Sequence, residues 1–192
     1  MIAPSPRTTA LTGLIKSQIE SGAMNPVCSH CEKCMLTPIH FAARYDDVEL
    51  LFVLLAQNDT ALDARTATGT FALLMATKQG CQRFVSLLLH SGCAVDVTEK
   101  YTGFSALHLA VTNCDAAMVQ LLLQNGAATR VDTKDSGGWT ALHWACYLSS
   151  QKIVTLLMDH GASVAAMNSS GMTPRDLLRN ELIVFGISED VK

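Results

Sequence analysis

The stretch "TALHWACYLSSQKIVTLLMDHG", residues 140 to 161, decides the fold because three other segments repeat its pattern. They are "TPIHFAARYDDVELLFVLLAQN" from Thr37, "FALLMATKQGCQRFVSLLLHSG" from Phe71 and "SALHLAVTNCDAAMVQLLLQNG" from Ser105, and they align without gaps. The four starts are 34, 34 and 35 residues apart, and a fifth, "TPRDLLRN" from Thr173, follows after 33. A period near 33 residues predicts an array of stacked units that bury their apolar faces against one another.

Each repeated segment contains two apolar motifs separated by a short polar break. The second motif has apolar residues at i, i+1, i+4 and i+5, which is the spacing of one helical face. Its members are Leu50, Leu51, Leu54 and Leu55; Phe84, Val85, Leu88 and Leu89; Met118, Val119, Leu122 and Leu123; and Ile153, Val154, Leu157 and Met158. We therefore expect each unit to be a helix, a turn and a second helix.

These units resemble the ankyrin repeat, whose pattern runs from Gly-x-Thr-Pro-Leu-His-x-Ala through two helices to Gly-Ala. The leading glycine is Gly69, Gly103, Gly138 or Gly171, and the trailing one is Gly92, Gly126 or Gly161. Met35 and Asn58 replace these glycines in the first unit. The resemblance implies an all-α repeat solenoid of helix-turn-helix units joined by β-turn or hairpin fingers, with about four full repeats and partial capping repeats.

The first helix of each unit has an expected start signal. The hydroxyl residues Thr37, Ser105, Thr140 and Thr173 are typical N-caps, and Pro38 and Pro174 suit the first helical position. His40, His108 and His143 recur at the fourth position of a unit, so we interpret them as structural imidazoles that bond the turn, as their counterparts do in the family. In the second unit, Phe71 and Leu74 replace the hydroxyl and the imidazole. This unit is either a hydrophobic variant, in which packing offsets about 1 kcal/mol of capping, or a softer repeat that a partner reshapes.

The repeat boundaries predict seven segments. They are an N-terminal segment with a capping half-repeat (1–23), an extended Cys-rich first finger (24–36), repeats 1 to 4 (37–70, 71–104, 105–139 and 140–172), and a truncated C-terminal cap (173–192).

Composition excludes several classes of function. The formal net charge is −3 and no block of like charges occurs, which argues against nucleic acid as a partner. The N-terminal stretch lacks the apolar run of a signal peptide, and no stretch is long and apolar enough to span a membrane. The odd number of cysteines, 7, suits a reducing compartment. We expect an intracellular protein, cytoplasmic and/or nuclear, that is monomeric on its own.

Motifs of catalysis are missing from the sequence. It contains no Gly-x-Ser-x-Gly, no Gly-x-x-x-x-Gly-Lys and no His-Glu-x-x-His. We expect a non-catalytic adaptor or protein-interaction module that uses no cofactor.

The resemblance implies that a protein partner binds the concave surface, formed by the fingers and the first helices. Carried over by register, the candidate binding residues are Tyr45, Lys78, Tyr101, Phe104, Thr112, Asn113, Trp139, Tyr147 and Met172. Large aromatic residues are typical of interface hot spots. The alternative is that these aromatics pack on one another and shield the loops. Trp144 lies inside the first helix of its unit, so we expect it in the core.

Other functions stay open at this point. The fingers before Ser105 and Thr140 are similar to those of inhibitors of NF-kappa-B, which regulate a transcription factor. A ubiquitin-ligase adaptor and a short kinase inhibitor are further candidates, the second on size alone. A different class is a zinc-binding or redox-sensitive protein that uses Cys28, His30, Cys31 and Cys34, whose close spacing makes them metal-ligand candidates.

Overall fold

The computed structural model describes residues 13, 17, 36–56 and 61–177. The chain divides into two compact units, one up to Ala94 and one from Val95 onward. Within the described ranges the regular elements are helices, and two isolated antiparallel bridges, Arg65–Phe71 and Thr98–Ser105, mark the fingers. None of the described helices is long and apolar enough to cross a membrane. The predicted half-repeat, most of the first finger and most of the C-terminal cap lie outside the described residues.

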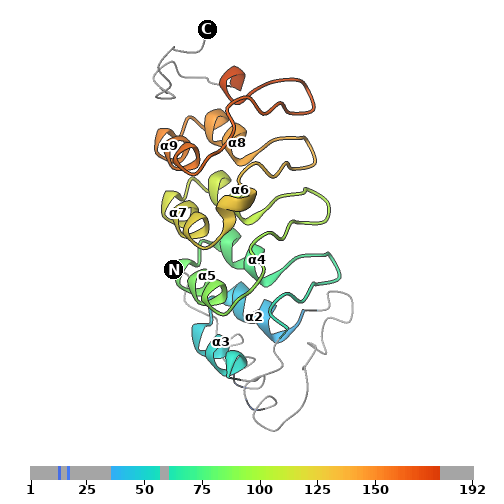
Figure 1. Cartoon of the computed structure of the whole chain (residues 1–192). Helices are drawn as coiled ribbons and strands as arrows, with labels where there is room; N and C mark the ends of the chain where they lie inside the picture. Colours follow the sequence, from blue (N-terminus) through green and yellow to red (C-terminus); the bar gives the residue numbers. More distant parts are fainter. Residues whose placement is uncertain (1–12, 14–16, 18–35, 57–60, 178–192) are drawn as a thin grey trace. The chain divides into compact units, whose positions relative to one another are not determined.

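The first unit contains two helix pairs (Figure 1). They are α2 (Pro38–Tyr45) with α3 (Val48–Leu55), and α4 (Ala72–Gln79) with α5 (Gln82–His90). The first helices α2 and α4 contact each other, and so do the second helices α3 and α5. Each pair is thus one helix-turn-helix repeat stacked on the next.

The second unit repeats this arrangement. It contains α6 (Ala106–Thr112) with α7 (Ala116–Gln124), a 3₁₀ turn η1 (Ala127–Arg130), α8 (Ala141–Tyr147) with α9 (Gln151–Asp159), and a short 3₁₀ turn η2 (Arg175–Leu177). Figure 1 shows α6 and α8 on the side from which the fingers project, with α7 and α9 on the other side. Helix α6 packs on α8, and α7 packs on α9.

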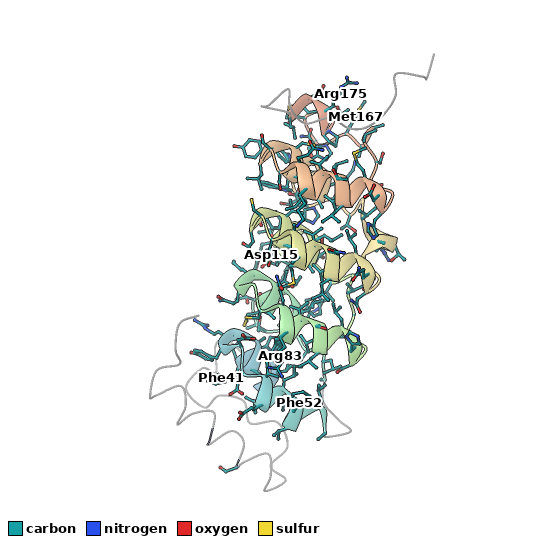
Figure 2. All side chains as sticks on the ribbon, turned by 90° about the vertical axis from the view of Figure 1, so that its left-hand side faces the viewer. Phe41, Phe52, Arg83, Asp115, Met167 and Arg175 are labelled. Atoms are coloured by element: carbon teal, nitrogen blue, oxygen red, sulfur yellow. The ribbon has the colours of Figure 1, made fainter. Side chains whose placement is uncertain are left out.

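The core of each unit consists of the apolar residues that the repeat pattern marks. The inner positions of the second helices are fully buried, and Figure 2 shows side chains filling the space between the helices. These residues are Leu50, Leu51, Phe84, Val85, Leu88, Met118, Val119, Leu122, Ile153, Val154 and Leu157. The apolar spacing therefore identified positions i, i+1 and i+4 of each buried face correctly, whereas Leu55, Leu89 and Met158 at i+5 are only half-buried.

The turn between the two helices of a repeat has the same conformation in all four pairs. One residue adopts a positive φ, between 53° and 75°, and the next N–H bonds back to the carbonyl of an alanine in the first helix. The positive-φ residues are Asp46, Gly80, Cys114 and Ser149, and the alanines are Ala42, Ala76, Ala110 and Ala145. Only Gly80 signals this conformation in the sequence, because the other three are side-chain-bearing residues in a region that favours glycine.

The predicted hydroxyl caps are only partly correct. The side chains of Ser105 and Thr140 accept from the backbone N–H of the residue three positions on. The Thr37 side chain makes no such bond, and its Oγ1 lies 2.8 Å from His40 Nδ1 instead. The Thr173 hydroxyl donates to Asp176, a carboxylate at the position where three of the other repeats have a histidine.

The second repeat compensates for its lost polar network by packing. Phe71 and Leu74 are both buried, and the Arg65 guanidinium lies 4.7 Å from the centre of the Phe71 ring. Apolar burial and a cation–π contact therefore stand in for the capping hydroxyl and the imidazole. This arrangement agrees with the interpretation as a hydrophobic variant.

Neighbouring fingers of the second unit are joined by backbone hydrogen bonds. The N–H of Ser136 donates to Thr102 O at 2.9 Å, and the N–H of Ser169 donates to Gly137 O at 3.1 Å. Gly138 has φ +76°, and a Cβ added there would lie 2.7 Å from both the N and the Oγ of Ser169. Glycine is therefore required at Gly138 by close approach of the next finger as well as by conformation.

We predict that Gly138→Ala destabilises the protein far more than Gly171→Ala. Both glycines have a positive φ near 75°, but a Cβ at Gly171 would meet no atom within 4 Å. Gly171→Ala should cost about 1 kcal/mol of unfolding free energy for the left-handed conformation. Gly138→Ala should cost roughly 3 kcal/mol or more because it also separates two fingers. Urea unfolding measures both, and equal losses would contradict the proposed close approach.

Candidate protein-binding site

Three histidines bind the first helix of a repeat to the finger that follows it. In the second unit, the Ser105 N–H donates to His108 Nδ1 at 3.2 Å, so the ring carries its proton on Nε2. That Nε2–H donates to Trp139 O, 3.0 Å away. His143 likewise accepts from the Thr140 N–H and donates to Met172 O. The predicted structural role of the histidines is confirmed, and their acceptors include two candidate binding residues.

The three imidazoles have a lowered pKa, although each donates a hydrogen bond to a backbone carbonyl. Burial lowers the pKa of His40, His108 and His143, and the hydrogen bond to a backbone carbonyl raises it by less. For His143, the neighbouring Lys134 lowers the pKa further while Asp135 raises it. Neutral rings at pH 7 keep Nδ1 available as the acceptor that the helix start requires.

Asp135 organises the finger before α8. Its Oδ1 accepts from the backbone N–H of Gly137 at 2.8 Å and from that of Trp139 at 2.9 Å, and its Oδ2 accepts from the Trp144 indole N–H at 2.9 Å. The side chain is buried, so these three bonds replace its hydration. One carboxylate thus fixes the turn of the finger and the orientation of an indole on the adjacent helix.

Four rings form what we call the aromatic cluster: Phe104, Trp139, Trp144 and Tyr147. The two indoles lie 4.8 Å apart between centroids. Tyr147 meets Trp139 edge-on at 5.7 Å, and Phe104 meets Trp144 edge-on at 5.6 Å. All four side chains are half-buried, so the cluster packs on itself and still presents ring surface to solvent.

The structure corrects the expectation for Trp144. Its ring is not in the core but lies among the finger aromatics, with its N–H on Asp135. The sequence-based prediction also missed Asp135 itself. The Asp-Ser-Gly-Gly turn is a signal that could have indicated it, because aspartate commonly accepts from the backbone N–H two residues later.

Four other candidate residues belong to the second unit: two in the fingers and two at the end of α6. Tyr101 is 73% exposed at the tip of its finger, and Met172 is half-buried. Thr112 and Asn113 end α6, where the Thr112 hydroxyl donates to Leu109 O.

The remaining two candidates belong to the first unit. Tyr45 is exposed at the end of α2 with its ring 4.6 Å from that of Phe41, and Lys78 is exposed in the last turn of α4.

The proposed metal or redox centre of Cys28, His30, Cys31 and Cys34 lies outside the described residues. In the part of the chain that the structure describes, no group of three or more His, Cys, Asp or Glu could hold a metal ion. Burial raises the pKa of Cys93 and of Cys146 to about 12, and burial with the Asp46 carboxylate raises that of Cys81 to about 11. These three thiols are therefore weak nucleophiles near neutral pH.

Comparison with known proteins agrees with the observed repeats. A family model for ankyrin repeats (3 copies) matches residues 8–99 and 88–168. The mouse B-cell lymphoma 3 protein homolog is 31% identical over 179 residues, which are 92% of this chain and 39% of that protein. The human SH3 and multiple ankyrin repeat domains protein 2 is 31% identical over 137 residues, 71% of this chain and 7% of that protein.

A solved structure shows the same fold. The crystal structure of the ankyrin repeat domain of Bcl-3, described as a unique member of the IkappaB protein family, has a TM-score of 0.81 and 31% identity to this chain. The match covers 91% of this chain and 76% of that one.

The paired helices, projecting fingers and imidazole bonds define a helical repeat protein. The chain belongs to the ankyrin repeat family. Ankyrin repeats are protein-interaction modules.

We predict that the protein loses stability in mild acid through its buried imidazoles. In the unfolded chain histidine titrates near pH 6.5, whereas burial lowers the pKa of His108 and His143 in the folded protein. Below pH 6.5 the unfolded state therefore binds more protons, and the free energy of unfolding falls as the pH drops toward the folded-state pKa. Each unit of lowering corresponds to about 1.4 kcal/mol.

Melting temperatures between about pH 7.5 and pH 5 test this. The control is the double variant His108→Leu, His143→Leu, which repeats the natural choice at Leu74. Its melting temperature should be lower at neutral pH and should depend less on pH. An equal pH dependence in the two proteins would show that these imidazoles are not responsible.

Proposed function

We propose that this chain is a non-catalytic adaptor that binds a protein partner through the fingers and first helices of its repeats. The aromatic cluster is the observation that carries the proposal. Three of its four half-buried rings, Phe104, Trp139 and Tyr147, occupy positions that the family resemblance assigns to binding. Asp135 accepts from the backbone N–H of Trp139 and from the indole N–H of Trp144. Rigid aromatic side chains with exposed faces suit an interface because little conformational entropy is lost when a partner covers them.

The proposed surface includes residues beyond the cluster. In the second unit these are the exposed Tyr101 and Asn113 and the half-buried Thr112 and Met172. In the first unit, Tyr45 and Lys78 occupy the corresponding positions at the ends of their helices. The partner is a protein rather than nucleic acid or a membrane, and the adaptor is a monomer on its own in the cytoplasm and/or nucleus.

A more specific candidate is a regulator of a transcription factor, as in inhibitors of NF-kappa-B. The similarity to the Bcl-3 ankyrin domain, at 31% identity and a TM-score of 0.81, favours it. The chain spans only 39% of the mouse B-cell lymphoma 3 protein homolog, so the similarity concerns the repeats alone. A transcription factor subunit among the captured partners would support this candidate.

We predict that Tyr101→Ala and Trp139→Ala abolish capture of a specific partner from cell lysate. Removing a hot-spot aromatic costs roughly 2 kcal/mol of binding free energy, or about thirtyfold in affinity. Tyr101→Ala should leave the melting temperature unchanged because the side chain is 73% exposed. Trp139→Ala should lower it modestly, since the ring packs on Trp144 and Tyr147. Affinity capture with mass spectrometry measures binding, and thermal unfolding measures stability.

Phe52→Ala is the matched control. Phe52 is 51% exposed on α3 (Figure 2), which is a second helix, whereas the proposed surface consists of fingers and first helices. This variant should keep the partners of the natural protein. If it loses them equally, or if both finger variants keep them, the proposed surface is wrong.

A further inference from the structure

Aromatic rings in two fingers already carry a cation from the chain itself. The Arg65 guanidinium lies 4.7 Å from the centre of the Phe71 ring, and the Lys100 ammonium lies 5.5 Å from that of Tyr101. A cation over an aromatic face is attracted by the negative charge density of the π system. In both fingers, one face of an aromatic ring is thus covered by a cationic side chain of the same chain.

The aromatic cluster differs from these two fingers. Among the described residues, no lysine or arginine lies over Phe104, Trp139 or Trp144, whose ring contacts are with other rings. Tryptophan is the aromatic side chain that attracts cations most strongly. Within the described part of the chain, the two indoles therefore carry no lysine or arginine over their faces.

A buried carboxylate lies against the same rings. Asp135 Oδ2 accepts the Trp144 indole N–H at 2.9 Å, and Oδ1 accepts the Trp139 backbone N–H. A negative charge at the edge of an indole makes its face more attractive to a cation, and partial burial reduces the screening by water.

The charged residues near the cluster act in opposite directions: Lys134 and Asp135 are both close enough to His143 to shift its pKa, Lys134 downward and Asp135 upward, so Asp135 favours a bound cation and Lys134 opposes it. The first helices α6 and α8 carry no charged side chain, and burial keeps His108 and His143 neutral. The nearest cation in sequence, Lys134, donates to Met167 O at 2.8 Å, and Met167 belongs to the next finger. Glu99, on the preceding finger, accepts from the Thr102 hydroxyl.

We propose that the aromatic cluster binds a lysine or arginine side chain of the partner, held over the indole faces of Trp139 and Trp144 and attracted by Asp135. The inference rests on the proposed function, and it gives the partner segment a chemistry: it is basic. Arginine and tryptophan are both enriched among interface hot spots, and a guanidinium stacks well on an indole. An apolar anchor would not use the charge of Asp135.

Intrinsic fluorescence reports this site alone, because the two tryptophans of the chain are Trp139 and Trp144. The first probe is tetramethylammonium chloride, a compact organic cation, compared with sodium chloride at equal ionic strength. We expect a saturable change in tryptophan emission with tetramethylammonium and none with sodium. The second probe is the peptide acetyl-Gly-Ser-Arg-Ser-Gly-amide, which should bind at least about threefold more tightly than its norleucine analogue.

A matched pair of variants isolates the carboxylate. Asparagine serves the same turn in the next finger, where Asn168 Oδ1 accepts from the N–H of Ser170 and Met172. Asp135→Asn alone would set an amide N–H against the Trp144 indole N–H, so both proteins of the pair also carry Trp144→Phe. Trp144→Phe should bind tetramethylammonium, and Trp144→Phe, Asp135→Asn should bind it about threefold less tightly or worse.

Equal binding by the two variants, or equal binding of the arginine and norleucine peptides, would overturn the inference. If Trp139→Ala still loses its partner in that case, the proposed function stands and the anchor is apolar. If the cation probes bind as expected but the finger variants keep every partner, the cation site is real and the proposed function fails.

Discussion

The bond from a neutral imidazole to the next finger is the constraint on which three of the four described repeats depend. In the second unit, His108 and His143 each accept a backbone N–H at the start of a first helix and donate to a carbonyl about thirty residues further on, as in the series Ser105–His108–Trp139. A single tautomer satisfies both partners. One residue therefore fixes the start of a first helix and the position of the following finger relative to that helix. The histidines bond to the backbone carbonyls of Trp139 and Met172 and not to their side chains. Other side chains at these two positions would therefore keep the bond.

Much of the fold could be predicted from the sequence because it repeats. Features that recur with the repeat period, such as the apolar faces, the finger glycines and the histidines, could be assigned a structural role from the sequence. Features that occur once were missed. The contact between Asp135 and Trp144 joins a finger to a helix nine residues later, and it depends on the angle at which the chain enters α8. The turn at Ser149 was predicted, but its left-handed conformation was missed for another reason: three different side-chain-bearing residues occupy that position in the repeats.

The two last fingers show what in the site serves folding and what does not. Asp135 and Asn168 cap the same turn with one oxygen each. The second oxygen of Asp135 binds an indole, whereas the amide nitrogen of Asn168 is buried without a hydrogen-bond partner. The turn therefore needs only one acceptor, and a charged residue at Asp135 exceeds that need. The additional acceptor lies where the two tryptophans of the chain meet, at the surface that we propose for binding.

Each unit contains a buried thiol that can serve as a probe of local opening. Cys93 belongs to the first unit and Cys146 to the second, and both are enclosed with a pKa near 12. A thiol-specific reagent reaches such a group only when the surrounding helices separate, so the rate of modification counts opening events. Cys114, exposed on the turn after α6, reacts without any opening and supplies the reference rate. Comparing the modification rates of Cys93 and Cys146 would thus show whether the two units open together or independently.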